Sequence, residues 1–191
     1  DKDNSTIYSF RISDLISIIN NCLTNSYEFF AEPLKPRNPY TNINFTKAQL
    51  YHIYFSIRNT NIVLPALIHQ YFLCNFNLKQ FKIHNESAII DTVICKFITN
   101  STRSEKLFHV HEMTYEYNDI LQIHNDFPSE LLYQNLSNLL KNYLFSKYSS
   151  SPTLKFQSKQ LIKDKLIKFK KEKPLFGRKI IQNNVESFIS F

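Results

Sequence analysis

The sequence predicts a mainly α-helical fold, in which a multi-helix globular body precedes a basic C-terminal helical arm. Apolar residues recur at helical spacing along most of the chain, and glycine occurs once, at Gly177. Ten of the 23 basic side chains but only three of the 16 acidic ones lie in residues 154–191, which therefore carry the whole net charge of +7. We expect a helical domain at 1–148, a linker at 149–153 and the basic arm at 154–191.

The first predicted helix runs from Asp14 to about Phe29, with Ser13 as its N-cap. Its apolar face consists of Leu15, Ile16, Ile19, Cys22 and Leu23. Three prolines between residues 31 and 44 then favour an extended connector, because proline fixes the backbone and restricts the residue before it.

The clearest helix start follows this connector. Thr46 and Gln49 have the spacing of a capping box, and Phe45 and Leu50 occupy the positions of a hydrophobic staple. This spacing predicts a helix that continues to about Arg58.

Further helices are predicted in the middle of the chain. Pro65 suits a first helical position, and residues 65–76 are apolar nearly all round, which indicates a buried central helix. Asn77 starts a short helix to about Ile83, and Asn85 caps the next one. The apolar face of that next helix consists of Ile90, Val93, Ile94, Phe97 and Ile98.

The segment 105–125 carries two patterns. Leu107, His109, His111 and Met113 alternate as in a strand, whereas the later residues repeat with helical spacing. We favour a helix, with a short β-hairpin near 105–117 as the alternative.

The last helix of the body begins at Pro128 and ends near Tyr148. Its inward-facing residues are Leu131, Leu132, Leu136, Leu139, Leu140 and Tyr143. The polar run from Ser149 to Pro152 then interrupts the pattern where the charge changes.

The composition argues against several classes of active site. Phosphate-cradling loops and dinucleotide-binding turns need several glycines, and the chain has one. We expect no catalytic residue, no cofactor and no metal site. His109 and His111 lack a third ligand at a recognisable spacing. Glu112 and Glu116 are expected on a solvated helix face, and the cysteines as small core residues. The cysteines are Cys22, Cys74 and Cys95.

Two further features bear on binding. A dense aromatic group is expected to form core or an oligomer contact, because few basic residues lie near it for nucleic-acid stacking. Its members are Tyr51, Tyr54, Phe55, Tyr71, Phe72 and Phe76. No run of about 18 apolar residues occurs, so we expect no membrane-spanning segment.

The arm is the candidate partner-binding site. Leu161, Ile162, Leu166 and Phe169 fall within one arc of a helix, and Ile167 interrupts this stripe. The candidate contact residues are Lys159, Lys163, Lys165, Lys168, Lys170, Lys171, Lys173, Arg178 and Lys179. The segment 175–191 adds apolar residues that favour docking on a protein. They are Ile180, Ile181, Val185, Phe188, Ile189 and Phe191.

One stretch resembles a known group of sequences. The matching residues are Glu32-Pro33, Asn38-Pro39-Tyr40-Thr41-Asn42, Phe45, Leu50-Tyr51, Ile53-Tyr54-Phe55, Phe76-Asn77-Leu78 and Phe81. Residues 32–81 thereby resemble a segment of uncharacterised proteins of large nucleocytoplasmic DNA viruses. The resemblance implies a viral protein of the virion or the host cytoplasm, and it carries no activity or catalytic residue.

These observations lead to two functional hypotheses. The first is a non-enzymatic viral structural or assembly protein, capsid-associated or otherwise virion-associated, that docks on other virion or assembly proteins or on a second copy of itself. The alternative is a viral factor that binds nucleic acid through phosphate contacts of the basic arm.

Overall fold

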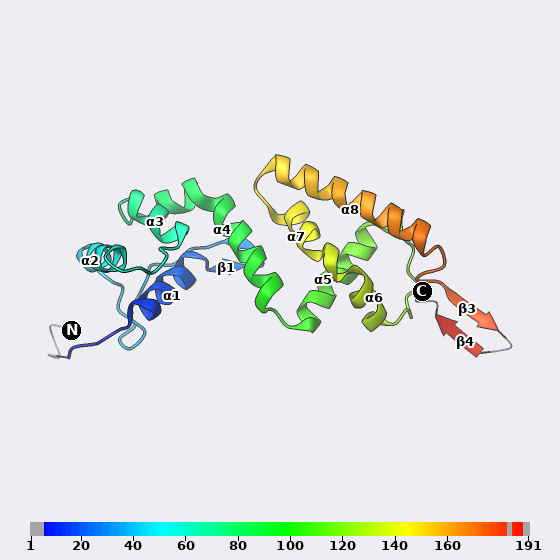
Figure 1. The fold of residues 1–191 in the computed structure, drawn as a ribbon, viewed down its shortest axis with the longest axis horizontal. Helices are drawn as coiled ribbons and strands as arrows, with labels where there is room; N and C mark the ends of the chain where they lie inside the picture. Colours follow the sequence, from blue (N-terminus) through cyan, green and yellow to red (C-terminus); the bar gives the residue numbers. More distant parts are fainter. Residues whose placement is uncertain (1–5, 183–184, 189–191) are drawn as a thin grey trace. The chain divides into compact units, whose positions relative to one another are not determined.

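The computed structural model describes the backbone of residues 6–182 and 185–188 and the side chains of residues 6–179. The fold is mainly α-helical, as the sequence predicts (Figure 1). The chain forms two compact units, which divide between Val93 and Ile94. The expected division at 149–153 therefore falls inside the second unit.

The first unit is built from short helices and one two-residue hairpin. Its elements are α1 (Ile12–Leu23), β1 (Ser26–Tyr27), β2 (Phe30–Ala31), α2 (Lys47–Arg58), α3 (Ala66–Leu73) and the first part of α4 (Leu78–Asn100). Strands β1 and β2 are antiparallel, with Ser26 opposite Ala31. Its fully buried large side chains include Leu23, Ile57, Ile68, Tyr71, Phe81 and Ile89.

Helix α1 is shorter than expected. It begins after Arg11, whose side chain makes no cap hydrogen bond, and it ends at Leu23 rather than near Phe29. The chain leaves the helical conformation at Thr24, and the hairpin turn at Glu28 and Phe29, with positive φ angles of 45° and 73°, occupies the end of the expected helix. A helix cannot continue through left-handed residues.

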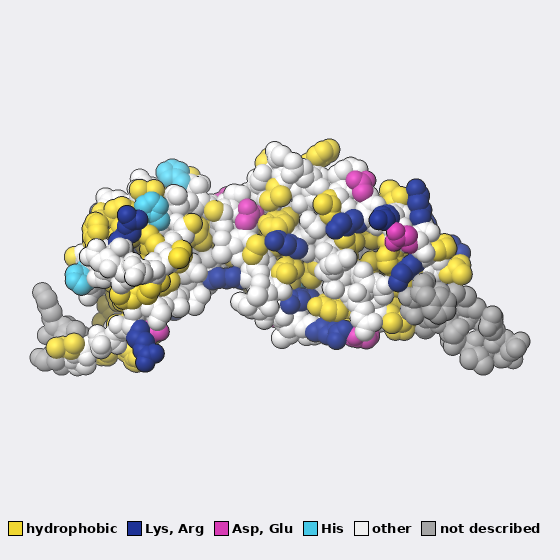
Figure 2. Space-filling model, viewed as in Figure 1, with side chains coloured by type: hydrophobic (Ala, Val, Ile, Leu, Met, Phe, Trp, Pro, Cys, Tyr) yellow, Lys and Arg dark blue, Asp and Glu magenta, His cyan; other side chains and the backbone are white. Residues whose placement is uncertain are grey.

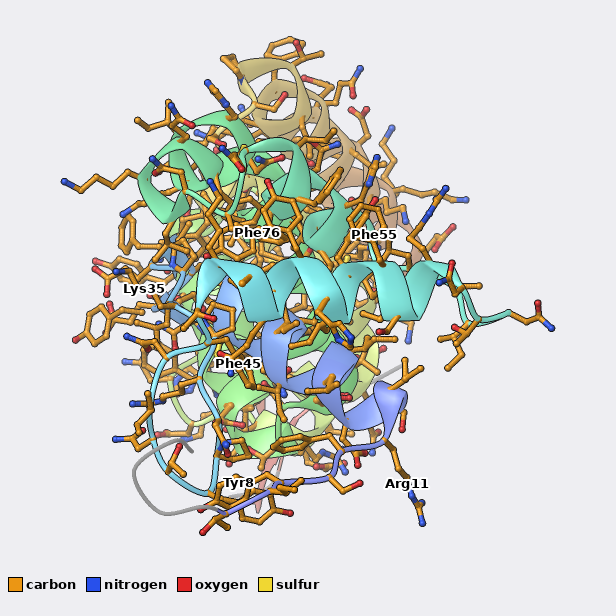
Figure 3. All side chains as sticks on the ribbon, turned by 90° about the vertical axis from the view of Figure 1, so that its left-hand side faces the viewer. Tyr8, Arg11, Lys35, Phe45, Phe55 and Phe76 are labelled. Atoms are coloured by element: carbon orange, nitrogen blue, oxygen red, sulfur yellow. The ribbon has the colours of Figure 1, made fainter. Side chains whose placement is uncertain are left out.

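Helix α2 begins as predicted. The Gln49 amide N–H donates to Thr46 Oγ1 at 3.3 Å, and the Thr46 amide N–H donates to Gln49 Oε1 at 2.8 Å, which completes the capping box. The helix buries Leu50, Ile53 and other apolar residues of the predicted stripe. In Figure 3, α2 crosses the view with the label of Phe76 above it and that of Phe45 below it.

The next two helices differ from the prediction. Helix α3 buries one face only, since Leu73 is 60% exposed. It ends before Asn75 and Phe76, which both have positive φ angles.

Helix α4 is continuous where two helices were expected. Asn85 does not cap a new helix, because its buried side chain donates to the Phe81 carbonyl oxygen one turn earlier at 3.0 Å.

The second unit contains the C-terminal part of α4 and the remaining elements. They are α5 (Arg103–Glu116), α6 (Ser129–Leu136), the 3₁₀ turn η1 (Ser137–Leu139), α7 (Leu140–Tyr148), α8 (Pro152–Glu172), β3 (Lys179–Gln182) and β4 (Val185–Phe188). Strands β3 and β4 form an antiparallel hairpin. The helix expected from Pro128 to Tyr148 is thus interrupted at η1.

The alternative of a hairpin near 105–117 is wrong. Thr102 and Glu105 form a second capping box, which starts α5 and carries a helix through this segment. The hairpin in this unit lies at β3 and β4 instead.

The predicted arm begins as a helix that packs within its own unit. Helix α8 lies along α7 and buries Ser158, Ile162 and Leu166. Ser149 is fully buried, and its hydroxyl accepts a hydrogen bond from the Ser151 amide at 3.2 Å. Residues 149–153 therefore form a tight turn and the start of α8 rather than a linker between domains. Helix α8 packs on α7 instead of forming a separate arm, because its apolar stripe needs a neighbouring helix to cover it.

The chain leaves α8 through a turn fixed by apolar packing. Phe176 is buried, with its ring centroid 4.9 Å from those of both Phe127 and Phe169. Gly177 follows with a φ of +82°, and its carbonyl accepts a hydrogen bond from the His124 amide at 2.9 Å. The side chains of Ile180, Ile181, Val185 and Phe188, and residues Ile189 and Phe191, lie outside the described part of the chain.

The packing of α8 predicts a clear contrast between neighbouring apolar positions. Leu166→Ala removes a buried side chain and should lower the free energy of unfolding by about 2–5 kcal/mol. Ile167→Ala, at a position 44% exposed, should change it by less than about 1 kcal/mol. Chemical denaturation of both variants checks the prediction, and equal effects would contradict it.

Gly177 gives a second stability prediction. A Cβ atom there would lie 2.5 Å from Ile123 Cδ1 and 3.0 Å from the Gln122 carbonyl oxygen, on a backbone that disfavours L side chains. Gly177→Ala should therefore lower the free energy of unfolding by roughly 1–3 kcal/mol. Lys163→Ala, at an exposed position in the middle of α8, is the control in thermal unfolding, and an unchanged melting temperature for Gly177→Ala would contradict this role.

Candidate partner-binding surface

Local sequence defines where α8 begins. Pro152 occupies its first turn, and the Ser151 hydroxyl accepts a hydrogen bond from the Leu154 amide at 3.4 Å. The helix contains 21 residues, so it extends about 30 Å. It provides a rigid support for the side chains of the predicted arm.

The lysines of α8 remain on its surface while the apolar stripe is covered. Six predicted contact residues are exposed: Lys159, Lys163, Lys165, Lys168, Lys170 and Lys171. Figure 2 shows dark-blue side chains over the C-terminal part of α8, with yellow and white ones over its first turns. Lys170 and Lys171 also lie in the last turn, where positive charge stabilises the helix itself.

Most of these charges make no ion pair with the residues that the structure describes. Lys168 pairs with Glu172 at 3.7 Å, and Asp164 accepts a hydrogen bond from Gln160 at 3.0 Å. The other five exposed lysines of α8 make no ion pair with any residue of the described chain. Their positive charge is therefore available to an external anionic group.

The remaining predicted contact residues behave differently. Lys173 is half-buried, and its Nζ donates to Asn135 Oδ1 at 3.0 Å. Lys179 lies 3.6 Å from Asp126, whereas Arg178 is exposed. Lys173 and Lys179 thus tie the end of the arm to its own unit.

Apolar side chains missed by the sequence analysis also lie on this surface. Phe156 is 71% exposed and Leu161 is 38% exposed, although Leu161 was expected within the buried arc. With Gln157, Gln160, Asp164 and Lys165 they line a surface hollow. Around the axis of α8, Phe156 and Leu161 each lie at least 100° from the buried Ile162. This spacing in the sequence indicates that both side chains face outward.

A charged network joins α5 to α7 in the same unit. Glu112 accepts from His109 Nδ1 at 2.7 Å and from Lys147 Nζ at 3.0 Å. Burial would raise the pKa of Glu112, but these hydrogen bonds and the positive charges outweigh it and lower that pKa. Burial opposes the charge on Lys147, yet the hydrogen bond to Glu112 raises the pKa of its ammonium group. Glu112 is therefore a structural carboxylate rather than part of a solvated face, whereas Glu116 is exposed.

The two histidines considered as a metal pair point to different neighbours. His109 contacts Glu112, whereas His111 Nε2 lies 3.1 Å from Ser129 Oγ. Their positions on a helix, rather than a strand, separate them by about 200°. Among the described residues there is no cluster of three or more His, Cys, Asp or Glu side chains suited to a metal ion.

A cysteine and a histidine meet in the first unit. Cys74 Sγ lies 3.9 Å from His84 Nδ1. A nucleophilic site would also need N–H donors for an oxyanion. The backbone amides that follow Cys74, those of Asn75, Phe76 and Asn77, already bond to carbonyls of α3 and the turn after it. These three amides are therefore not free to bind an oxyanion.

Two members of the aromatic group, Tyr54 and Tyr71, are buried in the core of the first unit, whereas Tyr51, Phe72 and Phe76 are partly exposed. Tyr54 and Phe72 stack with ring centroids 3.9 Å apart, and the Tyr54 hydroxyl lies 2.8 Å from His69 Nδ1. Burial raises the pKa of Tyr71 to about 12. Phe55 is half exposed, and Figure 3 shows it on α2.

These observations define the class of the protein as a mainly α-helical protein of two compact units with an exposed basic helix. No protein-family model, curated protein or solved structure matches the chain. Of the helices that the structure describes, none combines the length and the apolar character needed to cross a bilayer.

The Glu112 network predicts a pH-dependent loss of stability. Because its pKa is lower in the folded protein than in the unfolded chain, ionised Glu112 stabilises the fold above the ordinary carboxylate pKa. This contribution is lost as the pH falls through the folded-state pKa. At pH 7, Glu112→Gln should lower the free energy of unfolding by about 1 kcal/mol. The difference from wild type should shrink towards pH 3.

Glu116→Gln is the matched control, since it removes a carboxylate one turn further along α5 that is exposed. Urea denaturation at several pH values measures all three proteins. A Glu112→Gln effect that stays constant between pH 7 and pH 3 would contradict the assigned role.

Proposed function

We propose that this protein is a non-enzymatic structural or assembly protein of a virion, and that it docks on other proteins through the basic surface of α8. We define this surface as the exposed lysines Lys159, Lys163, Lys165, Lys168, Lys170 and Lys171 with the adjoining Phe156 and Leu161. The observation that carries the proposal is that α8 buries its apolar stripe within its own unit while these lysines remain exposed.

The rigidity of α8 supports docking. A flexible tail loses conformational entropy when it binds, whereas side chains on a packed helix are already held in place. Unpaired lysines attract an acidic partner over several ångströms and add contacts at the rim of an interface. Exposed apolar residues between them provide the contact area that protein interfaces use.

The viral assignment rests on sequence. Residues 32–81 resemble segments of proteins from large nucleocytoplasmic DNA viruses, and in this chain that stretch contains the connector, the capped helix α2, helix α3 and the start of α4. Scaffold elements of this kind suit a structural protein. The resemblance supports a place in the virion or at the site of assembly in the host cytoplasm.

One observation favours nucleic acid as the second candidate partner. Lys159, Lys163 and Lys170 lie within about 40° of one another around α8, and none makes an ion pair within the described chain. Such a row could contact successive phosphates, and affinity would then fall steeply with salt.

The triple variant Lys163→Gln/Lys170→Gln/Lys171→Gln tests the proposed docking. Fluorescence anisotropy with labelled poly-L-glutamate, an acidic polypeptide, should show roughly tenfold weaker binding than wild type. Each exposed charge contact contributes about 0.2–1 kcal/mol, and three are removed.

The control removes the same charge elsewhere, through Lys35→Gln/Lys79→Gln/Lys82→Gln at exposed positions of the first unit. This control should bind almost as wild type does. Equal weakening in both variants would show a non-specific charge effect and would sink the proposal.

A further inference from the structure

We infer that the partner of α8 is an acidic polypeptide segment that carries an apolar anchor residue separated from its acidic cluster. This inference rests on the proposed function and names the ligand of the same surface. It depends on the unequal distribution of apolar and charged side chains along the helix.

The first part of the surface is suited to an apolar side chain. The hollow beside Phe156 and Leu161 is bordered by the neutral side chains of Gln157 and Gln160, and the charged Asp164 and Lys165 line its C-terminal end. Phe156 is 71% exposed, so most of its ring is available for contact. An aliphatic or aromatic side chain of a partner would remove this apolar area from water.

The second part of the surface is suited to carboxylates. Lys165, Lys168 and Lys171 follow the hollow towards the C-terminus of α8 and are all exposed. From Phe156 to Lys168 the helix rises about 18 Å. An acidic cluster about 18 Å from the anchor, roughly twelve residues of a helix or five to six of an extended segment, would meet these ammonium groups.

Asp164 sets the spacing between the two parts. Its carboxylate borders the hollow and is held by Gln160 Nε2 at 3.0 Å. An acidic residue of the partner directly beside the anchor would meet this like charge as well as the ammonium group of Lys165, whereas acids further along α8 lie away from Asp164. Segments in which the anchor and the acids are separated are therefore preferred.

The same distribution disfavours nucleic acid. A nucleic-acid strand carries one charge at every nucleotide, whereas the first turn of α8 has only the half-buried Lys155, and the next lysine, Lys159, comes three residues after Phe156. A strand laid along α8 would thus find cations over only part of its length. A polypeptide can match the division, because its apolar and acidic residues can be placed separately.

The experiment uses the full chain and two synthetic peptides of equal length and charge. One peptide has a leucine about twelve residues before a glutamate cluster on a helical, alanine-rich background, and the other has serine in place of that leucine. The leucine peptide should bind wild type about tenfold more tightly than the serine peptide, as expected for one buried apolar side chain.

Variants of the protein assign this preference to α8. Phe156→Ser should remove the tenfold difference, whereas Phe156→Leu, which keeps an apolar surface, should retain most of it. Phe30→Ser in the first unit, at a position 62% exposed, is the matched control and should leave the preference intact. Circular dichroism confirms folding of each variant, and folding should persist because both phenylalanines are exposed.

The outcomes separate the two proposals. If both peptides bind wild type equally and Lys165→Gln/Lys168→Gln/Lys171→Gln still weakens both, the anchor is overturned while the proposed docking stands. If this lysine variant binds both peptides as wild type does, the proposed docking fails as well. If a homothymidine oligonucleotide of equal charge displaces the leucine peptide and Phe156→Leu abolishes that displacement, the ligand is nucleic acid stacked on Phe156 and the inference is overturned.

Discussion

Ile162 and Leu166, the apolar side chains that α8 buries, determine which residues of that helix face outward. Burying each contributes roughly 1.5–3 kcal/mol, which is enough to hold the helix along α7. Once this stripe is covered, the helical repeat fixes the positions of the lysines and of Phe156. The surface of the candidate site is thus a direct consequence of the core of the second unit.

The rest of that unit supports this arrangement. Helix α7, on which α8 lies, is tied to α5 through Glu112 and Lys147, and Lys173 binds Asn135 near the end of α8. Phe176 and Gly177 then turn the chain away from the helix. These contacts hold the basic helix along its buried side and at its end, so its charges are presented by a fixed support rather than by a mobile tail.

Much of the helical pattern could be predicted from local sequence, because capping and apolar spacing act over a few residues. Thr46 and Gln49 identified the start of α2, and Thr102 with Glu105 had the same signal for α5. Longer-range features could not be predicted in this way. Asn85 has the chemistry of a cap, yet the uninterrupted helix α4 uses it as an internal hydrogen-bond donor. The exposed lysines of the candidate surface followed from the sequence, whereas the internal partners of Lys173 and Lys179 depend on segments far apart in the chain.

Native-state hydrogen exchange of α8 tests most directly whether the basic surface lies on a packed helix. The amides between Ser158 and Phe169 should exchange as slowly as those of α7, because both helices open only when their shared packing is lost. Exchange of α8 that is many times faster than that of α7 would show an arm that separates from its unit, and it would contradict the account.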